Sequence, residues 1–106
     1  MEKVIVLGLG GCSHCETLQQ GLKEEKIPFK LLDVDLKENS ALADRMEALL
    51  KTDKYPIIII EGFEATTYLY RVDSINEAKE SPIHYATKVG CATTDSMVAI
   101  TKKYIK

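Results

Sequence analysis

The sequence has little net charge, few cysteines and no long hydrophobic run. Its 106 residues include 14 basic and 16 acidic side chains, mixed along the chain, which give a formal net charge of −2. No basic stripe is available for a phosphate backbone and no polybasic segment for a membrane surface, so we expect neither nucleic acid nor a membrane as a partner. A hydrophobic content of 45% is enough for one modest core, so we expect a single domain over residues 1–106, acting as a monomer.

We expect no targeting segment in the first residues. Only about six apolar residues follow the first three, too few for the core of a signal peptide and far too few to cross a bilayer. We therefore expect a cytoplasmic protein. The three cysteines, Cys12, Cys15 and Cys91, are too few for the disulfide framework of a small secreted protein. In a reducing compartment a C-x-x-C pair is usually catalytic or metal-binding.

The first 35 residues have the pattern of a βαβ unit. The β-branched run at residues 4–7 predicts a buried strand that ends at Gly8. Residues 13–25 place two leucines four apart among polar side chains, which predicts a short amphipathic helix. After Pro28 breaks that helix, residues 29–34 alternate as a second strand. A crossover of this length implies that the two strands are parallel, with a right-handed connection.

The middle of the chain predicts one more helix and two more strands. Residues 40–51 have one apolar helical face, for which Asn39 or Ser40 is a good N-terminal cap. The four isoleucines at residues 57–60 predict a central strand, and residues 65–71 predict an antiparallel return strand. The fold class predicted by these elements is α/β, with a four-stranded mixed sheet flanked by three or more helices.

The stretch from residue 72 to residue 89 is long for a connection. Its Ser74-x-x-Glu77 capping box predicts one or two helical turns before Pro82 stops them. Because the stretch is polar and interrupted by proline, we expect a surface excursion separate from the sheet. A last helix is predicted to begin near Thr94 and to run to the C-terminus.

The C-x-x-C motif at residues 12–15 carries the clearest chemistry. A turn with three glycines places the sulfur of Cys12 at a helix N-terminus, where unpaired N–H groups and the macrodipole favour an anion. Thiols of such motifs have pKa values of roughly 3.5 to 7.5, below the ~8.5 of a free cysteine. We therefore predict that Cys12 attacks disulfides and that Cys15, one helical turn later and more buried, resolves the mixed disulfide. His14 is either a residue that stabilises the thiolate or an exposed loop residue.

With these elements in place, the sequence resembles the glutaredoxins, whose fold is thioredoxin-like. In that family a strand, a Gly-Cys-x-x-Cys motif, a helix and a second strand follow in this order, as they do here over residues 3–60. The resemblance implies a cis-proline before the third strand, at Tyr55-Pro56, with its backbone facing Cys12. Tyr55, next to that proline, is a candidate for lining a substrate groove.

A second likeness lies just before the last helix. Gly90-Cys91 is similar to the family's segment that binds the γ-glutamyl carboxylate of glutathione through backbone N–H groups, although Ala92 and Thr93 stand where the family has aspartates. The resemblance thus implies a glutathione-dependent thiol-disulfide oxidoreductase that acts on disulfide-containing proteins, with glutathione as co-substrate and no bound metal. Electrons would come from glutathione or a flavin-dependent reductase. With its insertion at residues 72–89, the chain is identified as a divergent member.

Two other functions fit parts of the sequence. The glycines at residues 8, 10 and 11, followed by Asp33 and Asp35 after the next strand, are similar to a dinucleotide-binding fingerprint. Its third glycine would fall at Ser13, however, and the chain leaves little room for a second mononucleotide half.

The other alternative is an iron–sulfur or zinc-binding module. The available soft ligands are Cys12, His14, Cys15, His84 and Cys91. Structural zinc sites usually have two close pairs of ligands, which the last two residues do not form. A cluster that bridges two chains through Cys12 and glutathione stays open as an alternative.

Overall fold

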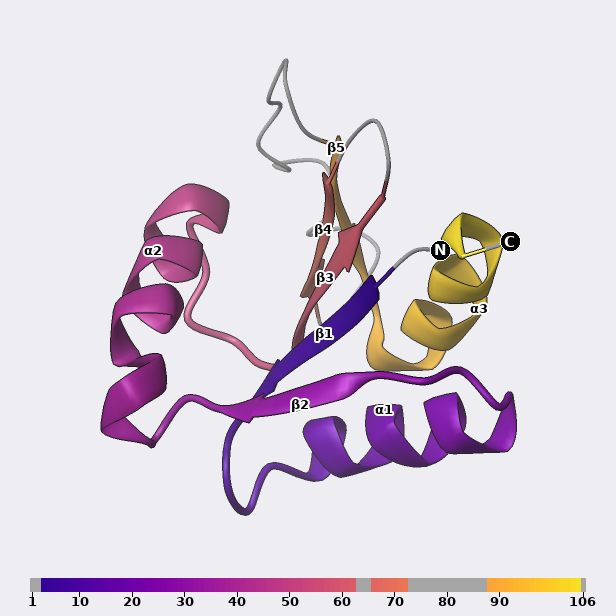
Figure 1. The fold of residues 1–106 in the computed structure, drawn as a ribbon, viewed down its shortest axis with the longest axis horizontal. Helices are drawn as coiled ribbons and strands as arrows, with labels where there is room; N and C mark the ends of the chain where they lie inside the picture. Colours follow the sequence, from indigo (N-terminus) through magenta and orange to yellow (C-terminus); the bar gives the residue numbers. More distant parts are fainter. Residues whose placement is uncertain (1–2, 63–65, 73–87, 106) are drawn as a thin grey trace.

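A twisted mixed sheet with helices on both of its faces forms the structure (Figure 1). The computed structural model describes residues 3–62, 66–72 and 88–105. Within these residues the elements follow the order β1 (Lys3–Gly8), α1 (Ser13–Glu24), β2 (Lys30–Asp33), the 3-10 helix η1 (Lys37–Asn39), α2 (Ser40–Leu50), β3 (Ile57–Glu61), β4 (Thr66–Arg71), β5 (Lys88–Ala92) and α3 (Thr94–Tyr104).

The strands of the described residues have the order β2-β1-β3-β4-β5. β1 runs parallel to β2, as the predicted βαβ unit requires, whereas β3 is antiparallel to both β1 and β4. All four predicted strands and the three predicted helices are present, so the predicted thioredoxin-like α/β fold is confirmed. The antiparallel pairing of β3 with β1 is incompatible with the doubly wound parallel sheet of a dinucleotide-binding fold.

β5 is a fifth strand, one more than the sequence predicted. It runs parallel to β4 and pairs Lys88 with Thr67 and Ala92 with Arg71. The predicted excursion at residues 72–89 is therefore wrong at both ends, because Val72 is buried in the core and residues 88 and 89 belong to the sheet. A strand that is parallel to its partner follows a long crossover, so the sequence before it has no hairpin-turn residues that would predict it. The glycine inside this short strand also weakens the alternation of apolar and polar residues. The capping box lies outside the described residues.

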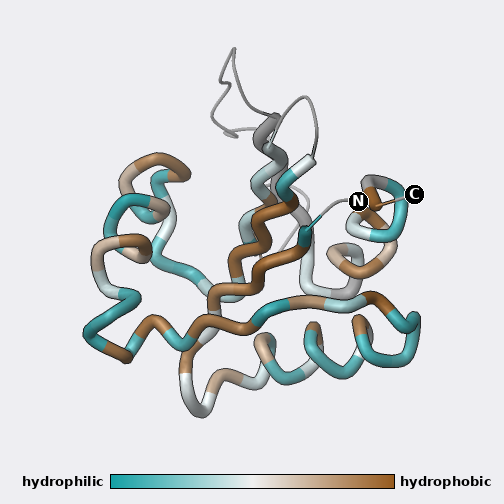
Figure 2. Tube along the Cα trace, viewed as in Figure 1, coloured by the Kyte–Doolittle hydropathy of each residue, from teal (hydrophilic) through white to brown (hydrophobic). Residues whose placement is uncertain are grey.

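The two faces of the sheet are covered by different helices. α1 and α3 pack on one face, where Leu18, Leu22 and Met97 are buried in one hydrophobic cluster. α2 covers the other face with Met46 and Leu50. Figure 2 shows the hydrophobic residues concentrated in the central strands, with hydrophilic residues on the outer sides of the helices. No helix in the described part of the chain has the length and apolar composition needed to span a membrane.

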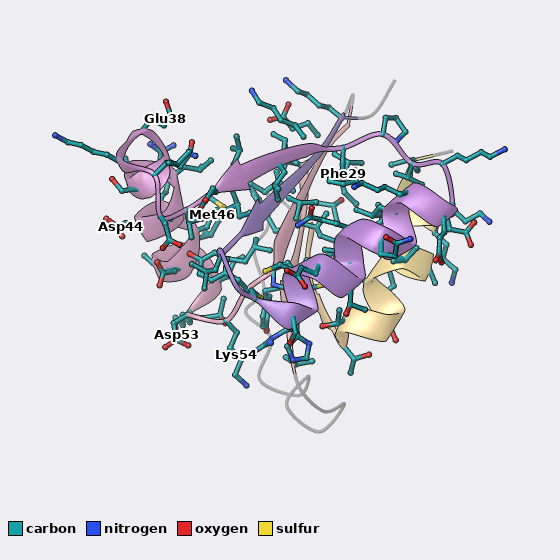
Figure 3. The ribbon with its side chains drawn as sticks, turned by 90° about the horizontal axis from the view of Figure 1, so that it is seen from below. Phe29, Glu38, Asp44, Met46, Asp53 and Lys54 are labelled. Carbon is teal, nitrogen blue, oxygen red and sulfur yellow. The ribbon has the colours of Figure 1, made fainter. Side chains whose placement is uncertain are left out.

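The side chains drawn in Figure 3 show the same division on η1 and α2. Met46 lies between α2 and the sheet, whereas Glu38 of η1 and Asp44 of α2 point away from the sheet. The apolar face inferred from the sequence is therefore the face that packs, and it fixes α2 beside the loop that leads into β3.

α1 and α3 approach each other closely at Gly21. A Cβ atom added there would lie 2.7 Å from Cγ2 of Val98, but 3.7 Å from its Cβ. We expect Gly21→Ala to lower the free energy of unfolding by about 1 kcal/mol, because overpacking costs about 1–3 kcal/mol and the gain in helix propensity returns about 1. In a Val98→Ala background the same change should stabilise the protein. Urea unfolding of the four proteins measures this coupling, and stabilisation by Gly21→Ala in both backgrounds would contradict it.

Candidate functional site

The C-x-x-C motif begins where β1 ends, in the turn that leads into α1. Gly11 has a φ of 73°, a left-handed conformation that side chains rarely adopt. This turn places Cys12 as the N-cap of α1, with an extended backbone. The predicted position of Cys12 at a helix N-terminus is therefore what the structure shows.

Cys12 is half-buried, and its sulfur is surrounded by backbone polar groups. The backbone N–H of Cys15 donates to Cys12 Sγ over 3.2 Å, and Cys12 Sγ lies 3.8 Å from the carbonyl oxygen of Tyr55. The Tyr55-Pro56 peptide bond is cis, as the resemblance implied. The backbone before β3 thus faces Cys12 across the site. The hydrogen bond from the Cys15 amide, in the first turn of α1, and the N-terminal end of the helix both favour negative charge at this sulfur.

Cys15 is the buried partner, with 1% of its surface exposed. Its Sγ lies 2.6 Å from Cys12 Sγ and is placed to donate a hydrogen bond to it, and both cysteines are free. Burial and, to a smaller extent, the hydrogen bond with Cys12 raise the pKa of the Cys15 thiol to about 12, while a backbone hydrogen bond at Leu9 acts in the opposite direction. At neutral pH Cys15 is therefore a thiol, and the two sulfurs differ in exposure and in the polar groups around them.

His14 contacts α3 through its side chain. Its Nδ1 lies 2.9 Å from Oγ1 of Thr94, a buried residue at the start of α3. Among the described residues no hydrogen bond joins the imidazole to either sulfur, so stabilisation of the thiolate by His14 stays a prediction. The sequence indicated Thr94 only as a helix start, because two residues 80 positions apart share no local pattern.

Tyr55 contributes its backbone to the site and its side chain to the core. The side chain is buried, in the same hydrophobic cluster as Cys15 and Met46. Burial raises the pKa of the Tyr55 hydroxyl to about 12, and the nearby carboxylate of Glu47 adds to the effect. The phenol therefore stays neutral at physiological pH.

Gly90 and Cys91 lie inside β5, where they pair with Leu69 and Tyr70. They are thus strand residues, and α3 begins at Thr94. Their contribution to a glutathione site stays a prediction. In the part of the chain that the structure describes, no three His, Cys, Asp or Glu side chains come together as metal ligands. His84 lies outside these residues.

Two hollows lie on the surface of the described residues. One of about 1020 Å³ opens between the C-terminal end of α2 and the end of β4; its lining includes Lys54 and Arg71 together with Glu47 and Asp53. Figure 3 shows Asp53 and Lys54 in the loop that leads from α2 to Tyr55. The other, of about 560 Å³, lies between α1 and α3 and carries acidic side chains. Neither lining includes Cys12 or Cys15.

The fold and the dithiol define a class of protein. A family model described as Glutaredoxin matches residues 4–63. The chain belongs to the glutaredoxin family, and this membership supports a role of the thiol-disulfide oxidoreductase type.

Comparison with individual proteins adds little. No curated protein matches the chain. A solved structure described as "Structure of a malarial protein" is 20% identical, with a TM-score of 0.45, over 98% of this chain and 99% of that one.

Proposed function

We propose that this chain reduces disulfides of proteins or glutathione mixed disulfides by thiol-disulfide exchange, with glutathione as co-substrate. The observation that carries the proposal is the inequality of the two sulfurs. Cys12 is accessible and accepts a hydrogen bond at a helix N-terminus, whereas Cys15 is buried, protonated and 2.6 Å away. Such a pair suits one attacking and one resolving thiol.

The exchange proceeds in two displacements. The Cys12 thiolate attacks one sulfur of the substrate disulfide, forming a Cys12–substrate disulfide and releasing the other sulfur as a thiolate. Cys15 then loses its proton and attacks Cys12 Sγ, which closes the Cys12–Cys15 disulfide and releases the second substrate thiol. Two glutathione molecules restore the dithiol and leave as oxidised glutathione. This cycle requires a reducing compartment, and we propose the cytoplasm, with the chain acting as a monomer.

A comparison of two electron donors tests this function. We expect the protein to reduce a peptide–glutathione mixed disulfide when it is supplied with glutathione, glutathione reductase and NADPH, followed by NADPH consumption. A matched reaction contains thioredoxin reductase and NADPH without glutathione. Turnover only in the second reaction would show that a flavin-dependent reductase, and not glutathione, is the electron donor. Absence of turnover in both would contradict an oxidoreductase function.

A further inference from the structure

The sheet register brings a cation on β4 toward the dithiol. Ile57 of β3 pairs with Leu7 of β1 and with Tyr70 of β4. One position further along each strand, Gly8, Pro56 and Arg71 therefore lie in one row across the three strands. A Cβ atom at Gly8 would lie 3.5 Å from both Cβ and Sγ of Cys15. Cys15 therefore lies over the β1 end of this row. Adjacent strands are about 4.8 Å apart, so the Cα of Arg71 is about 10 Å from that end, a gap that a long arginine side chain shortens.

The direction of the Arg71 side chain follows from strand alternation. Leu69, two residues earlier on β4, belongs to the hydrophobic cluster beneath α1 and α3. Arg71 therefore starts from the same face of the sheet as Gly8, which follows Val4 and Val6 of that cluster and whose Cβ would approach Cys15. Arg71 is only half-exposed, whereas its neighbours Tyr70 and Val72 are buried in the cluster on the opposite face. The guanidinium is thus partly desolvated, on the face from which a Cβ at Gly8 would approach Cys15.

The charges around Cys15 make this cation consequential. Burial is the larger effect and raises the pKa of Cys15, whereas the Arg71 guanidinium lowers it. The other ionisable side chains of the cluster are Cys12, Tyr55, Tyr68 and Tyr70. Of these, Tyr55 stays neutral because of its raised pKa. Arginine keeps its charge at every working pH, so its field acts on Cys15 throughout.

We propose that Arg71 is a positioning residue for the resolving step, in which its guanidinium stabilises the negative charge that develops on Cys15. The proposal rests on the proposed function and adds a residue outside the C-x-x-C motif to it. In this step the S–H bond of Cys15 breaks and a Cys15–Cys12 disulfide forms. The bond between Cys12 and the substrate sulfur breaks, and the departing thiolate takes the electron pair and a proton from solvent. In this step Cys15 is oxidised and the substrate sulfur is reduced, while the Cys12 sulfur is part of a disulfide before and after, so no further reactant is needed.

Single-turnover reaction with 4,4′-dithiodipyridine separates the two steps. This neutral probe releases one thiopyridone when Cys12 attacks and a second when Cys15 resolves the adduct. We expect Arg71→Gln to keep the first phase within about twofold and to slow the second about tenfold at neutral pH, the equivalent of one pKa unit. The rise of the second-phase rate with pH should move to higher pH. Arg71→Lys should restore most of the rate, because it keeps the charge.

Controls separate this role from a structural one. Lys103→Gln removes the same charge from an exposed position on α3 and should leave both phases unchanged. In a Cys15→Ser background, Arg71→Gln should not alter the remaining phase. Equal slowing of both phases by Arg71→Gln and Arg71→Lys, or an unchanged second phase in Arg71→Gln, would overturn the proposal. If Arg71→Gln does not fold, the pH profile of Arg71→Lys tests the proposal. The lysine charge lies at a different distance from Cys15, so it should shift the pH dependence of the second phase and leave the first phase unchanged. Absence of a first phase in the unmodified protein would contradict the proposed function instead.

Discussion

Cys12→Ser is expected to abolish disulfide exchange, with a loss of about a thousandfold or more, as is typical when an enzyme loses its nucleophile. The neighbouring thiol of Cys15 cannot take over the attack. Cys15 is 1% exposed, and its pKa of about 12 leaves a thiolate fraction of about 10⁻⁵ at pH 7. A serine hydroxyl at the N-cap can still accept the hydrogen bond from the Cys15 amide, so the helix start should survive the substitution.

Mass spectrometry after mixing with oxidised glutathione measures this loss directly. We expect no glutathione adduct on Cys15 in Cys12→Ser on the timescale at which the unmodified protein reacts. Thiol titration in denaturant confirms that Cys15 remains reduced in the variant. Thr17→Ser, an exposed change on the same helix, is the matched control and should react normally. An adduct on Cys15 in Cys12→Ser that forms as fast as the adduct on Cys12 in Cys15→Ser would reverse the roles of the two cysteines.

Local patterns in the sequence were sufficient for the elements that carry the dithiol. Three segments have the residue pattern that is typical of the element they form: the β-branched run of β1, the four isoleucines of β3 and the leucines four apart in α1. The position of Cys12 at the start of α1 follows from the glycine-rich turn that precedes it. The cis bond at Tyr55-Pro56 came from the family resemblance and is present in the structure.

Features that depend on contacts between distant segments were not predicted. β5 pairs with β4 only after a crossover, and a glycine in the middle of the strand hides its pattern. The contact between His14 and Thr94 joins positions 80 residues apart. Arg71 resembled an ordinary strand end, and its proximity to the dithiol follows only from the register of three strands. Sequence periodicity reports which face of an element is buried, but not which element covers it.

The resolving step depends on pH through Cys15. Burial raises the pKa of this thiol. As long as the pH lies below this pKa, the thiolate fraction of Cys15 rises about tenfold for each unit by which the pH increases. The second displacement in the unmodified protein should therefore accelerate as pH rises from neutral toward alkaline values. The step should be slowest in mild acid, where the Cys12–substrate disulfide persists longest.

Cys15→Ser is expected to keep the first displacement and lose the second. Cys12 retains its backbone hydrogen bond and the helix N-terminus, so its attack should proceed within a fewfold of the normal rate, while a serine hydroxyl cannot displace a thiolate from sulfur. The variant should accumulate as a one-to-one mixed disulfide on Cys12, detectable as a mass increase equal to one substrate thiol. The rate at which this mixed disulfide forms should lack the steep alkaline rise of the resolving step.

Added glutathione should release the adduct, so turnover on glutathionylated peptides persists while turnover on intramolecular protein disulfides is lost. Failure to form any adduct, in a variant that unfolds at the normal urea concentration, would indicate a structural or metal-binding pair.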